Sequence, residues 1–297
     1  MKKKYLAALA AAAIEGFAFY AWMEARRYSL KTYRIPVLPE GAEPLRILQV
    51  SDLHLIPDNY RLISFLESLA DDTYDLVLAT GDLLGGPKSV RECVRLLNSL
   101  NGKLGRYVVF GSSDYYAPVL KNYLDYFTGR KKVGTRRNPT GTFRAGLTEG
   151  GWEILSNRSI QADLNGIRAQ ITGLDDPFLN RDDRELLVRE PFADFAVCVV
   201  HDPSPYTDAF KAGYDLVVSG HTHGGQVRLP FIGAVVTNSD LPSRYARGAS
   251  DFGGRWLFVS PGLGTGKFAP FRFLCPPEAS VLELVARDEP DDEGLLI

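Results

Sequence analysis

The chain of 297 residues has few residues that form cross-links or bind soft metals: three cysteines and two methionines. Cys93 lies in a helical pattern and Cys198 in an apolar run typical of a strand, and with Cys275 they match neither a disulfide framework nor a cysteine zinc site. We therefore interpret all three as buried free thiols. The formal net charge is only −2, and aromatic residues rarely alternate with basic ones, so no nucleic-acid partner is expected.

Long apolar runs are also scarce, and the longest lies at the N-terminus. Residues 5–23 are mostly apolar and have basic residues on both sides, and about twenty apolar residues in a helix match the thickness of a bilayer core. Glu15 and the high alanine content oppose insertion. We predict a transmembrane signal-anchor helix over residues 1–27, and hence a single-pass protein of a bacterial cell membrane with its orientation left open. A cleaved signal peptide and a soluble or merely interfacial helix are the alternatives.

The rest of the chain divides into three parts. Residues 28–44 contain prolines and are expected to form a linker between the helix and the folded part. Residues 45–286 have the length and composition of one folded domain. Residues 287–297 are acidic and are expected to form a disordered tail.

Within residues 45–286, short apolar runs alternate with helical patterns. This alternation predicts βαβ units and a largely parallel sheet. Residues 151–176 differ, because their strand patterns meet at Asn165-Gly166, which is typical of a hairpin turn. Helices are expected at 61–72 and 89–101, and strands within 45–55, 74–84, 105–116, 195–203, 214–225 and 255–264.

All four histidines follow predicted strands, in company with aspartates. In open α/β sheets the carboxyl ends of parallel strands share one edge, where ligands bind. One histidine in such a place would most simply be a core imidazole, but four of four favour a metal site for zinc, iron or manganese. Glycines 220, 224 and 225 permit the tight turns that this requires. The polar clusters are Asp52-x-His54, Gly81-Asp82, Gly111-Ser112-Ser113-Asp114, His201-Asp202 and Gly220-His221-Thr222-His223.

The blocks "SDLHL", "TGDLLGG", "VVHDP" and "SGHTHGGQ", in this order and spacing, resemble the signature of the calcineurin-like metallophosphoesterases from about Leu45 to Leu284. The stretches "GLDDP" and "GLGTGKFAPFRFLCPPE" are similar to a membrane-tethered bacterial subgroup that includes phosphodiesterases of the UDP-2,3-diacylglucosamine hydrolase type. The resemblance implies an α/β fold in which two mixed β-sheets pack together and are flanked by helices, as a four-layer sandwich.

The resemblance also implies two divalent metal ions, manganese, iron or zinc, which would activate a hydroxide for in-line attack on phosphorus. It assigns Asp52, His54 and His223 to the first metal, His201 and His221 to the second, and Asp82 to both as a bridging ligand.

One block departs from the family pattern. The family has Gly-Asn-His followed by Asp or Glu, where the asparagine completes the second metal site and the histidine assists the leaving group. This chain has Gly111-Ser112-Ser113-Asp114, so the second site and Ser112 as its ligand are in question. Asp114 is a candidate replacement, and Tyr115 and Tyr116 are candidate proton donors. We take Asp82, Asp114 and His201 as the candidate catalytic residues.

The missing histidine also bears on the substrate. A positioned general acid contributes about 10²–10⁴ in rate, so its loss favours leaving groups that are stable as anions. We predict a metal-dependent phosphohydrolase that acts on a phosphodiester or diphosphate bond, as in a nucleotide- or diphosphate-linked lipid. The basic loop 127–143 fits either a solvated loop or a lid over an anionic substrate. The alternative function is a catalytically weakened relative that binds a phosphorylated lipid or protein partner.

Overall fold

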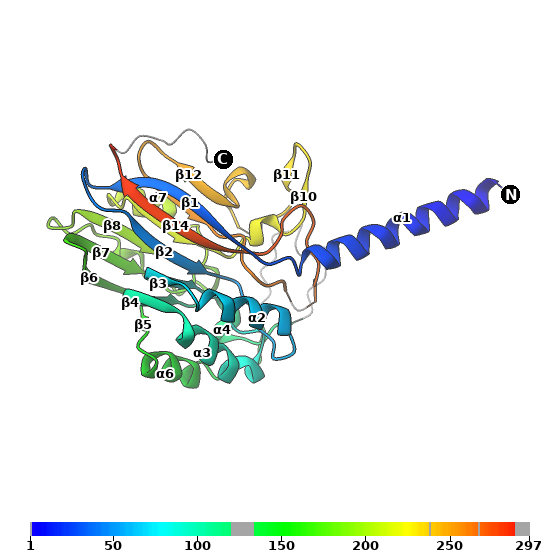
Figure 1. Ribbon diagram of the computed structural model, residues 1–297, viewed down its shortest axis with the longest axis horizontal. Coiled ribbons are helices and arrows are strands. Elements are labelled where there is room, and N and C mark those ends of the chain that lie inside the picture. The colour runs from blue at the N-terminus through cyan, green and yellow to red at the C-terminus, as the bar shows by residue number, and fades with distance from the viewer. Residues whose placement is uncertain (1, 120–133, 238, 267, 289–297) are drawn as a thin grey trace.

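The computed structural model describes residues 2–119, 134–237, 239–266 and 268–288, which form two six-stranded sheets with helices on their outer sides (Figure 1). The expected α/β fold with two mixed sheets is confirmed. Most of the predicted tail 287–297, and residues 127–133 of the basic loop, lie outside the described residues.

The first sheet has the strand order β1-β14-β2-β3-β4-β5. Strands β2 to β5 are parallel to one another, and β14 is antiparallel to β2. The carboxyl ends of β2, β3 and β4 therefore share one edge of this sheet. Its strands are β1 (Ser29–Leu38), β2 (Leu45–Val50), β3 (Thr73–Thr80), β4 (Asn101–Val109), β5 (Glu153–Ile154) and β14 (Glu278–Ala286).

The second sheet has the order β12-β13-β9-β8-β7-β6. Its four central strands are parallel, and both outer strands are antiparallel to their neighbours. The predicted hairpin is confirmed, because Asn165 and Gly166 join β6 to β7 with positive φ angles of 56° and 90°. The strands are β6 (Arg158–Leu164), β7 (Ile167–Gly173), β8 (Phe195–Val199), β9 (Leu216–Ser219), β12 (Gly248–Asp251) and β13 (Trp256–Val259), and β10 (Arg228–Leu229) pairs separately with β11 (Gly233–Ala234).

Three apolar clusters hold these layers together. One lies between the sheets and includes Ile47 and Val197. A second joins the first sheet to α2, α3 and α6, and a third joins the second sheet to α7. Helix α2 begins where the Asn59 side chain accepts a hydrogen bond from the amide of Leu62 (3.3 Å), a standard N-cap. The helices of the domain are α2 (Tyr60–Leu69), α3 (Val90–Ser99), α4 (Ser112–Tyr115), α6 (Thr140–Glu149) and α7 (Tyr206–Lys211), with short turns η1 (Pro87–Ser89), η2 (Pro177–Leu179), η3 (Arg184–Leu186), η4 (His223–Gly225) and η5 (Ser243–Tyr245).

The segment 28–44, which the sequence predicts to be a linker, is part of the fold. Its strand β1 runs parallel to β14 from Ser29 to Leu38, and Ile35 is fully buried in the cluster between the sheets. The proline content is misleading here, because proline is tolerated in a strand at the edge of a sheet, and Pro36 precedes an irregularity in the pairing.

The N-terminal run forms the helix α1 (Lys2–Glu24), but the prediction that it anchors the protein in a membrane is wrong. Among the helices of the described residues, none is long and apolar enough to cross a bilayer. The reason lies in the composition already noted, since alanine contributes little hydrophobicity and Glu15 interrupts the run.

The last turns of α1 pack onto the segment that precedes β14. Ala21 and Glu24 are buried, and the carbonyl of Ala21 accepts a hydrogen bond from the amide of Arg272 (3.0 Å). The rings of Phe17 and Phe273 lie 4.8 Å apart. The remainder of α1 extends away from the domain (Figure 1), so only its C-terminal end is part of the packed structure.

The position of β1 gives a direct test on stability. Replacing Ile35 with alanine removes a fully buried side chain and should lower the free energy of unfolding by about 2–5 kcal/mol. Leu30→Ala on the same strand is the control, because Leu30 is 41% exposed and should cost about 0.5 kcal/mol or less. Urea unfolding measures both. Equally small effects would mean that residues 28–44 behave as the linker that the sequence suggests.

Candidate metal centre

The predicted ligands meet where the carboxyl ends of strands from both sheets come together. Asp52 and Asp82 follow β2 and β3, while His201 and His221 follow β8 and β9. Five of the six have a positive φ between 38° and 69°. Such angles cost about 1–3 kcal/mol each in residues other than glycine and cluster at functional sites. The five are Asp52, His54, Asp82, His221 and His223.

Two glycines permit this close assembly. A Cβ on Gly111 would overlap the Asp82 carboxylate and the His201 ring, and one on Gly220 would overlap Ser51 and Asp52. Any larger residue at either position would therefore push the candidate ligands apart.

One oxygen of the Asp52 carboxylate accepts hydrogen bonds, and the other has no hydrogen-bond partner in the described structure. Its Oδ2 accepts hydrogen bonds from the Ser51 hydroxyl (2.6 Å) and from the amide of His221 (3.0 Å). Its Oδ1 is buried without a hydrogen-bond partner in the described structure and lies 3.6 Å from Nε2 of His223. A buried carboxylate oxygen in this state requires a cation or a proton.

The rings of His54 and His223 stack beside this oxygen. Their centroids are 5.1 Å apart, and their Nε2 atoms are 3.2 Å apart. Burial lowers the pKa of His223 to about 3, opposed by the charge of Asp52. His223 is therefore neutral at physiological pH, which is the form of imidazole that binds a metal.

The second pair of histidines has its ring orientation fixed by neighbours. Nδ1 of His201 donates to the carbonyl of Thr80 (2.7 Å), which leaves Nε2 free to face the site. Nδ1 of His221 lies 3.3 Å from that atom, and Nε2 of His221 lies 3.5 Å from a carboxylate oxygen of Asp202. A carbonyl and a carboxylate behind the rings are the partners that usually orient metal-binding histidines.

Asp82 lies between the two histidine pairs. Its Oδ2 is 3.5 Å from Nε2 of His54, and its Oδ1 is 3.6 Å from Nε2 of His201. Burial opposes ionisation of both Asp82 and His201, but their mutual attraction keeps the pKa of Asp82 well below and that of His201 well above the usual values. The carboxylate is therefore ionised and faces both halves of the site.

The backbone of the divergent block Gly111–Asp114 contacts the candidate metal ligands. The amide of Ser113 donates to Oδ1 of Asp82 (2.7 Å). The carboxylate of Asp114 accepts hydrogen bonds from the amides of Leu83, Leu84 and Gly111 (2.9–3.0 Å), so it holds this loop and is not brought into the ligand cluster. Burial, together with the charge of Asp82, raises the pKa of Asp114 to about 7. Ser112 is half-buried at the start of α4, and its role as a ligand stays a prediction.

Asp176 is a further carboxylate near the second pair of histidines, to which the sequence motifs assign no role. It follows β7, whose last residue Gly173 pairs with Val199, two positions before His201. The ring of Phe178, in the turn that Asp176 caps, packs 5.4 Å from the ring of His221.

The Asp176 side chain is fully buried, and its Oδ2 has no hydrogen-bond partner among the described residues. Burial raises the pKa of Asp176 to about 8, with the charge of His201 opposing and that of Asp82 adding to the effect. Asp176 is therefore a buried carboxylate beside the second pair of histidines whose Oδ2 no described residue satisfies. Its only signal in the sequence is its place at the end of a strand, in "GLDDP".

Arg272 is a second residue that sequence reasoning missed. It is fully buried, and its guanidinium donates to the carbonyls of Pro261 (2.8 Å) and Gly264 (2.6 Å). Its Nη2 also lies 3.4 Å from Nδ1 of His223. It therefore supports the ring of His223 from behind.

The donor set fits divalent cations. Two groups of three side chains each present ligand atoms within 4.8 Å of one another: Asp52 with His54 and His223, and Asp52 with Asp82 and His201. Imidazole nitrogens and carboxylate oxygens suit zinc, iron and manganese, and the unpartnered oxygen of Asp52 faces these nitrogens. His221 and Ser112 are in neither group, so the second half of the site is less complete.

Comparison with known proteins agrees with this geometry. The family model described as calcineurin-like phosphoesterase matches residues 45–225. The chain belongs to this family. The predicted enzyme class, a metallophosphoesterase, is thereby confirmed, and the family's dependence on metals agrees with the cluster.

Curated relatives extend the similarity over most of the chain. The uncharacterised metallophosphoesterase YkuE of Bacillus subtilis is 27% identical over 95% of both chains. The phosphodiesterase YaeI of Escherichia coli is 26% identical over 96% of this chain and 99% of its own. The UDP-2,3-diacylglucosamine pyrophosphatase LpxG of Chlamydia muridarum is 26% identical over 84% and 86%, respectively.

The central position of Asp82 predicts the effect of removing its charge. Asp82→Asn should weaken metal binding in both halves of the site by more than about tenfold, whereas His223→Ala should affect one half. Metal content of the purified chain, measured by mass spectrometry after dialysis, checks both. Asp72→Asn removes an exposed carboxylate and is the matched control. Metal content in Asp82→Asn equal to that of the control would refute the assignment.

Asp176 has its own test. If its carboxylate completes the second half of the site, Asp176→Asn should lower the affinity for a second equivalent of Mn²⁺ by about 10–100-fold and leave the first equivalent bound. Electron paramagnetic resonance of free Mn²⁺ during a titration measures this without any turnover. Asp183→Asn, at an exposed carboxylate on the neighbouring turn, serves as the control. Equal loss of both equivalents, or no loss, contradicts the role.

Proposed function

We propose that the protein is a metal-dependent phosphohydrolase that cleaves a diphosphate bond or an activated phosphodiester. The observation that carries this proposal is the buried cluster in which Asp82 faces both pairs of histidines. Bound divalent cations, with manganese, iron or zinc as candidates, would supply Lewis-acid polarisation of the phosphoryl group and acidify a water. The residues of the chain have to hold, orient and shield that arrangement.

The orientation comes from neighbours that are themselves fixed. The carbonyl of Thr80 and the carboxylate of Asp202 set the rings of His201 and His221. Ser51 and the amide of His221 direct the free oxygen of Asp52 toward His223. Reaction at phosphorus depends on positioning and charge stabilisation, and this rigid frame is suited to both.

Among the described residues next to the divergent block, one candidate proton donor is already engaged. Tyr115, a candidate donor, gives its hydroxyl hydrogen to Oδ1 of Asp175 (2.7 Å). Burial and this carboxylate raise the pKa of Tyr115 above its ordinary value. The hydroxyl is thus engaged elsewhere and is a poorer acid than free tyrosine, which favours substrates whose leaving group departs as a stable anion.

Diphosphate linkages and nucleotide esters have such leaving groups. The similarity to a phosphodiesterase and to a UDP-2,3-diacylglucosamine pyrophosphatase over most of the chain supports this class. We therefore propose a nucleotide- or diphosphate-linked substrate, with a lipid-linked one as the first to test.

The leaving-group argument gives a quantitative expectation. On a series of phosphodiesters, kcat/KM should fall steeply as the pKa of the leaving group rises, and diphosphates should be cleaved faster than alkyl esters. The double variant Ser112→Asn with Ser113→His restores the family pattern and should raise the rates on alkyl esters most, by up to about 10²-fold. The assay uses the purified full chain with added Mn²⁺, and Asp82→Asn gives the background.

Two results would contradict the proposal. Rates independent of leaving-group pKa, with no gain in the double variant, would show that an acid is present after all. A chain that holds metal but turns over none of the substrates would favour a binding protein for a phosphorylated partner.

A further inference from the structure

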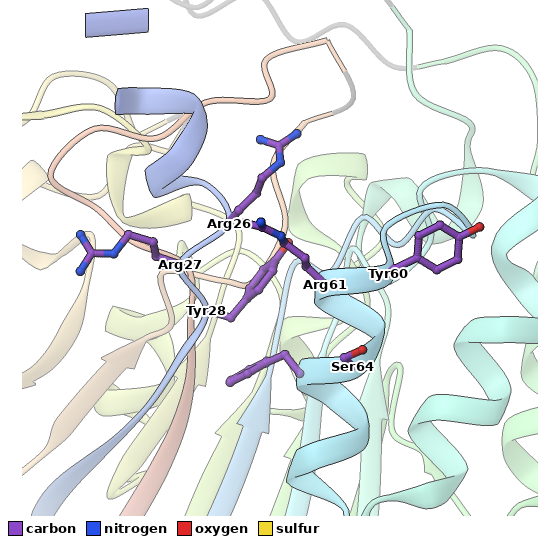
Figure 2. Close-up of a pocket in the computed structure, with 7 residues that line it drawn as sticks. Arg26, Arg27, Tyr28, Tyr60, Arg61 and Ser64 are labelled. Atoms are coloured by element: carbon purple, nitrogen blue, oxygen red, sulfur yellow. The ribbon is translucent and has the colours of Figure 1, made fainter. Parts of the chain in front are cut away.

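A second concave site lies between the end of α1 and the start of α2. This pocket has a volume of about 450 Å³ and carries three arginines, while none of its lining residues is acidic. We call it the arginine pocket. Its lining residues are Arg26, Arg27, Tyr28, Tyr60, Arg61, Ser64 and Phe65 (Figure 2).

Arg26 and Arg61 lie beside an aromatic floor. Tyr28 stacks on Phe65 with ring centroids 5.6 Å apart, and Asn59 donates to its hydroxyl (3.2 Å). Figure 2 shows Arg61 extending from α2 toward Arg26 and over Tyr28, whereas the guanidinium of Arg26 and the side chain of Arg27 point away from it. Burial raises the pKa of Tyr28, and the nearby charges of Arg26 and Arg61 oppose that shift.

The positive charge of the arginine pocket is not neutralised within the part of the chain that the structure describes. Elsewhere arginines form ion pairs, as Arg95 does with Glu67 and Arg168 with Asp194. The Arg26 guanidinium contacts Trp22, whose carbonyl accepts a hydrogen bond (2.8 Å) and whose ring lies 3.9 Å from the guanidinium carbon. Burial and the nearby charge of Arg61 both lower the pKa of Arg26. Two cations held together without an acid provide a site for an anion.

Arg272, which contacts the candidate ligand His223, also influences a residue of the arginine pocket. The charge of Arg272, whose Nη2 lies 3.4 Å from Nδ1 of His223, also opposes the raised pKa of Tyr28. On the other side, α2 begins at Tyr60, six residues after His54. Arg272 and the segment between His54 and α2 therefore connect the pocket to the first half of the metal centre.

We propose that the arginine pocket binds a phosphate-class anion. The planar guanidinium of Arg61 can give two parallel hydrogen bonds to phosphate oxygens, Arg26 adds a second charge, and the Ser64 hydroxyl adds a neutral donor. The anion has two candidate sources: a second phosphate group of a substrate cleaved at the metal centre, or free inorganic phosphate. Only the first source rests on the proposed function.

The first arm of the test measures binding without turnover. The full-length chain is kept in chelator, which removes phosphate binding by metals, and is titrated calorimetrically with inorganic phosphate and with pyrophosphate. Arg26→Gln and Arg61→Gln should each weaken binding by about tenfold, and the double variant should show none. Arg158→Gln, an exposed arginine on the edge strand β6 of the second sheet, should bind as the wild type does.

Thermal unfolding confirms that each variant is folded. Absence of binding to the wild type, or equal affinity in the folded double variant, overturns the proposal.

The second arm distinguishes the two sources. With Mn²⁺ present, KM is compared for two substrates that share the scissile bond, of which one carries a second phosphate. If that phosphate occupies the arginine pocket, Arg61→Gln should raise the KM of the two-phosphate substrate by about tenfold more than that of the other. An equal effect on both, with phosphate binding lost in the first arm, assigns the pocket to free phosphate. If neither substrate is turned over, the proposed function is contradicted. The first arm still shows whether the arginine pocket binds phosphate.

Discussion

The structure depends on holding carboxylate and imidazole side chains in contact inside a buried space. Nitrogen and oxygen atoms of different ligand side chains lie 3.2–3.6 Å apart, and Oδ1 of Asp52 has no partner among the described residues. Without a cation such a group is costly, because a buried charge loses its hydration. Bound metal would replace that hydration, so metal affinity and the stability of this part of the fold are expected to be linked.

The backbone around the site reflects the same constraint. Parallel strands bring their carboxyl ends to one edge, but a strand that simply continued would point alternate side chains to opposite faces. A residue with a left-handed backbone conformation follows three of the strands and changes the direction of the backbone there. These residues are Asp52, Asp82 and His221. The cost of these turns is offset by the two large apolar clusters on either side of the first sheet, which fix where the strands end.

The sequence predicts well what depends on local pattern. The strands before Asp52, Asp82, His201 and His221 are readable because parallel buried strands are continuous apolar runs, and their shared edge follows from topology. Features that depend on distant partners are not readable. The strand β1 is stabilised by β14, about 250 residues later in the chain, and Arg272 resembles any surface arginine until its carbonyl partners are seen.

The N-terminal segment shows most clearly that the site depends on residues outside its sequence motifs. The family model begins at residue 45, whereas the similarity to YkuE covers 95% of this chain. In the structure, the carbonyl of Ala21 accepts a hydrogen bond from the amide of Arg272, and the guanidinium of Arg272 reaches His223. The end of α1 therefore supports the candidate ligand His223 indirectly, through Arg272. Conditions that detach α1 from the domain should therefore first lower the metal affinity of the half of the metal centre that contains His223.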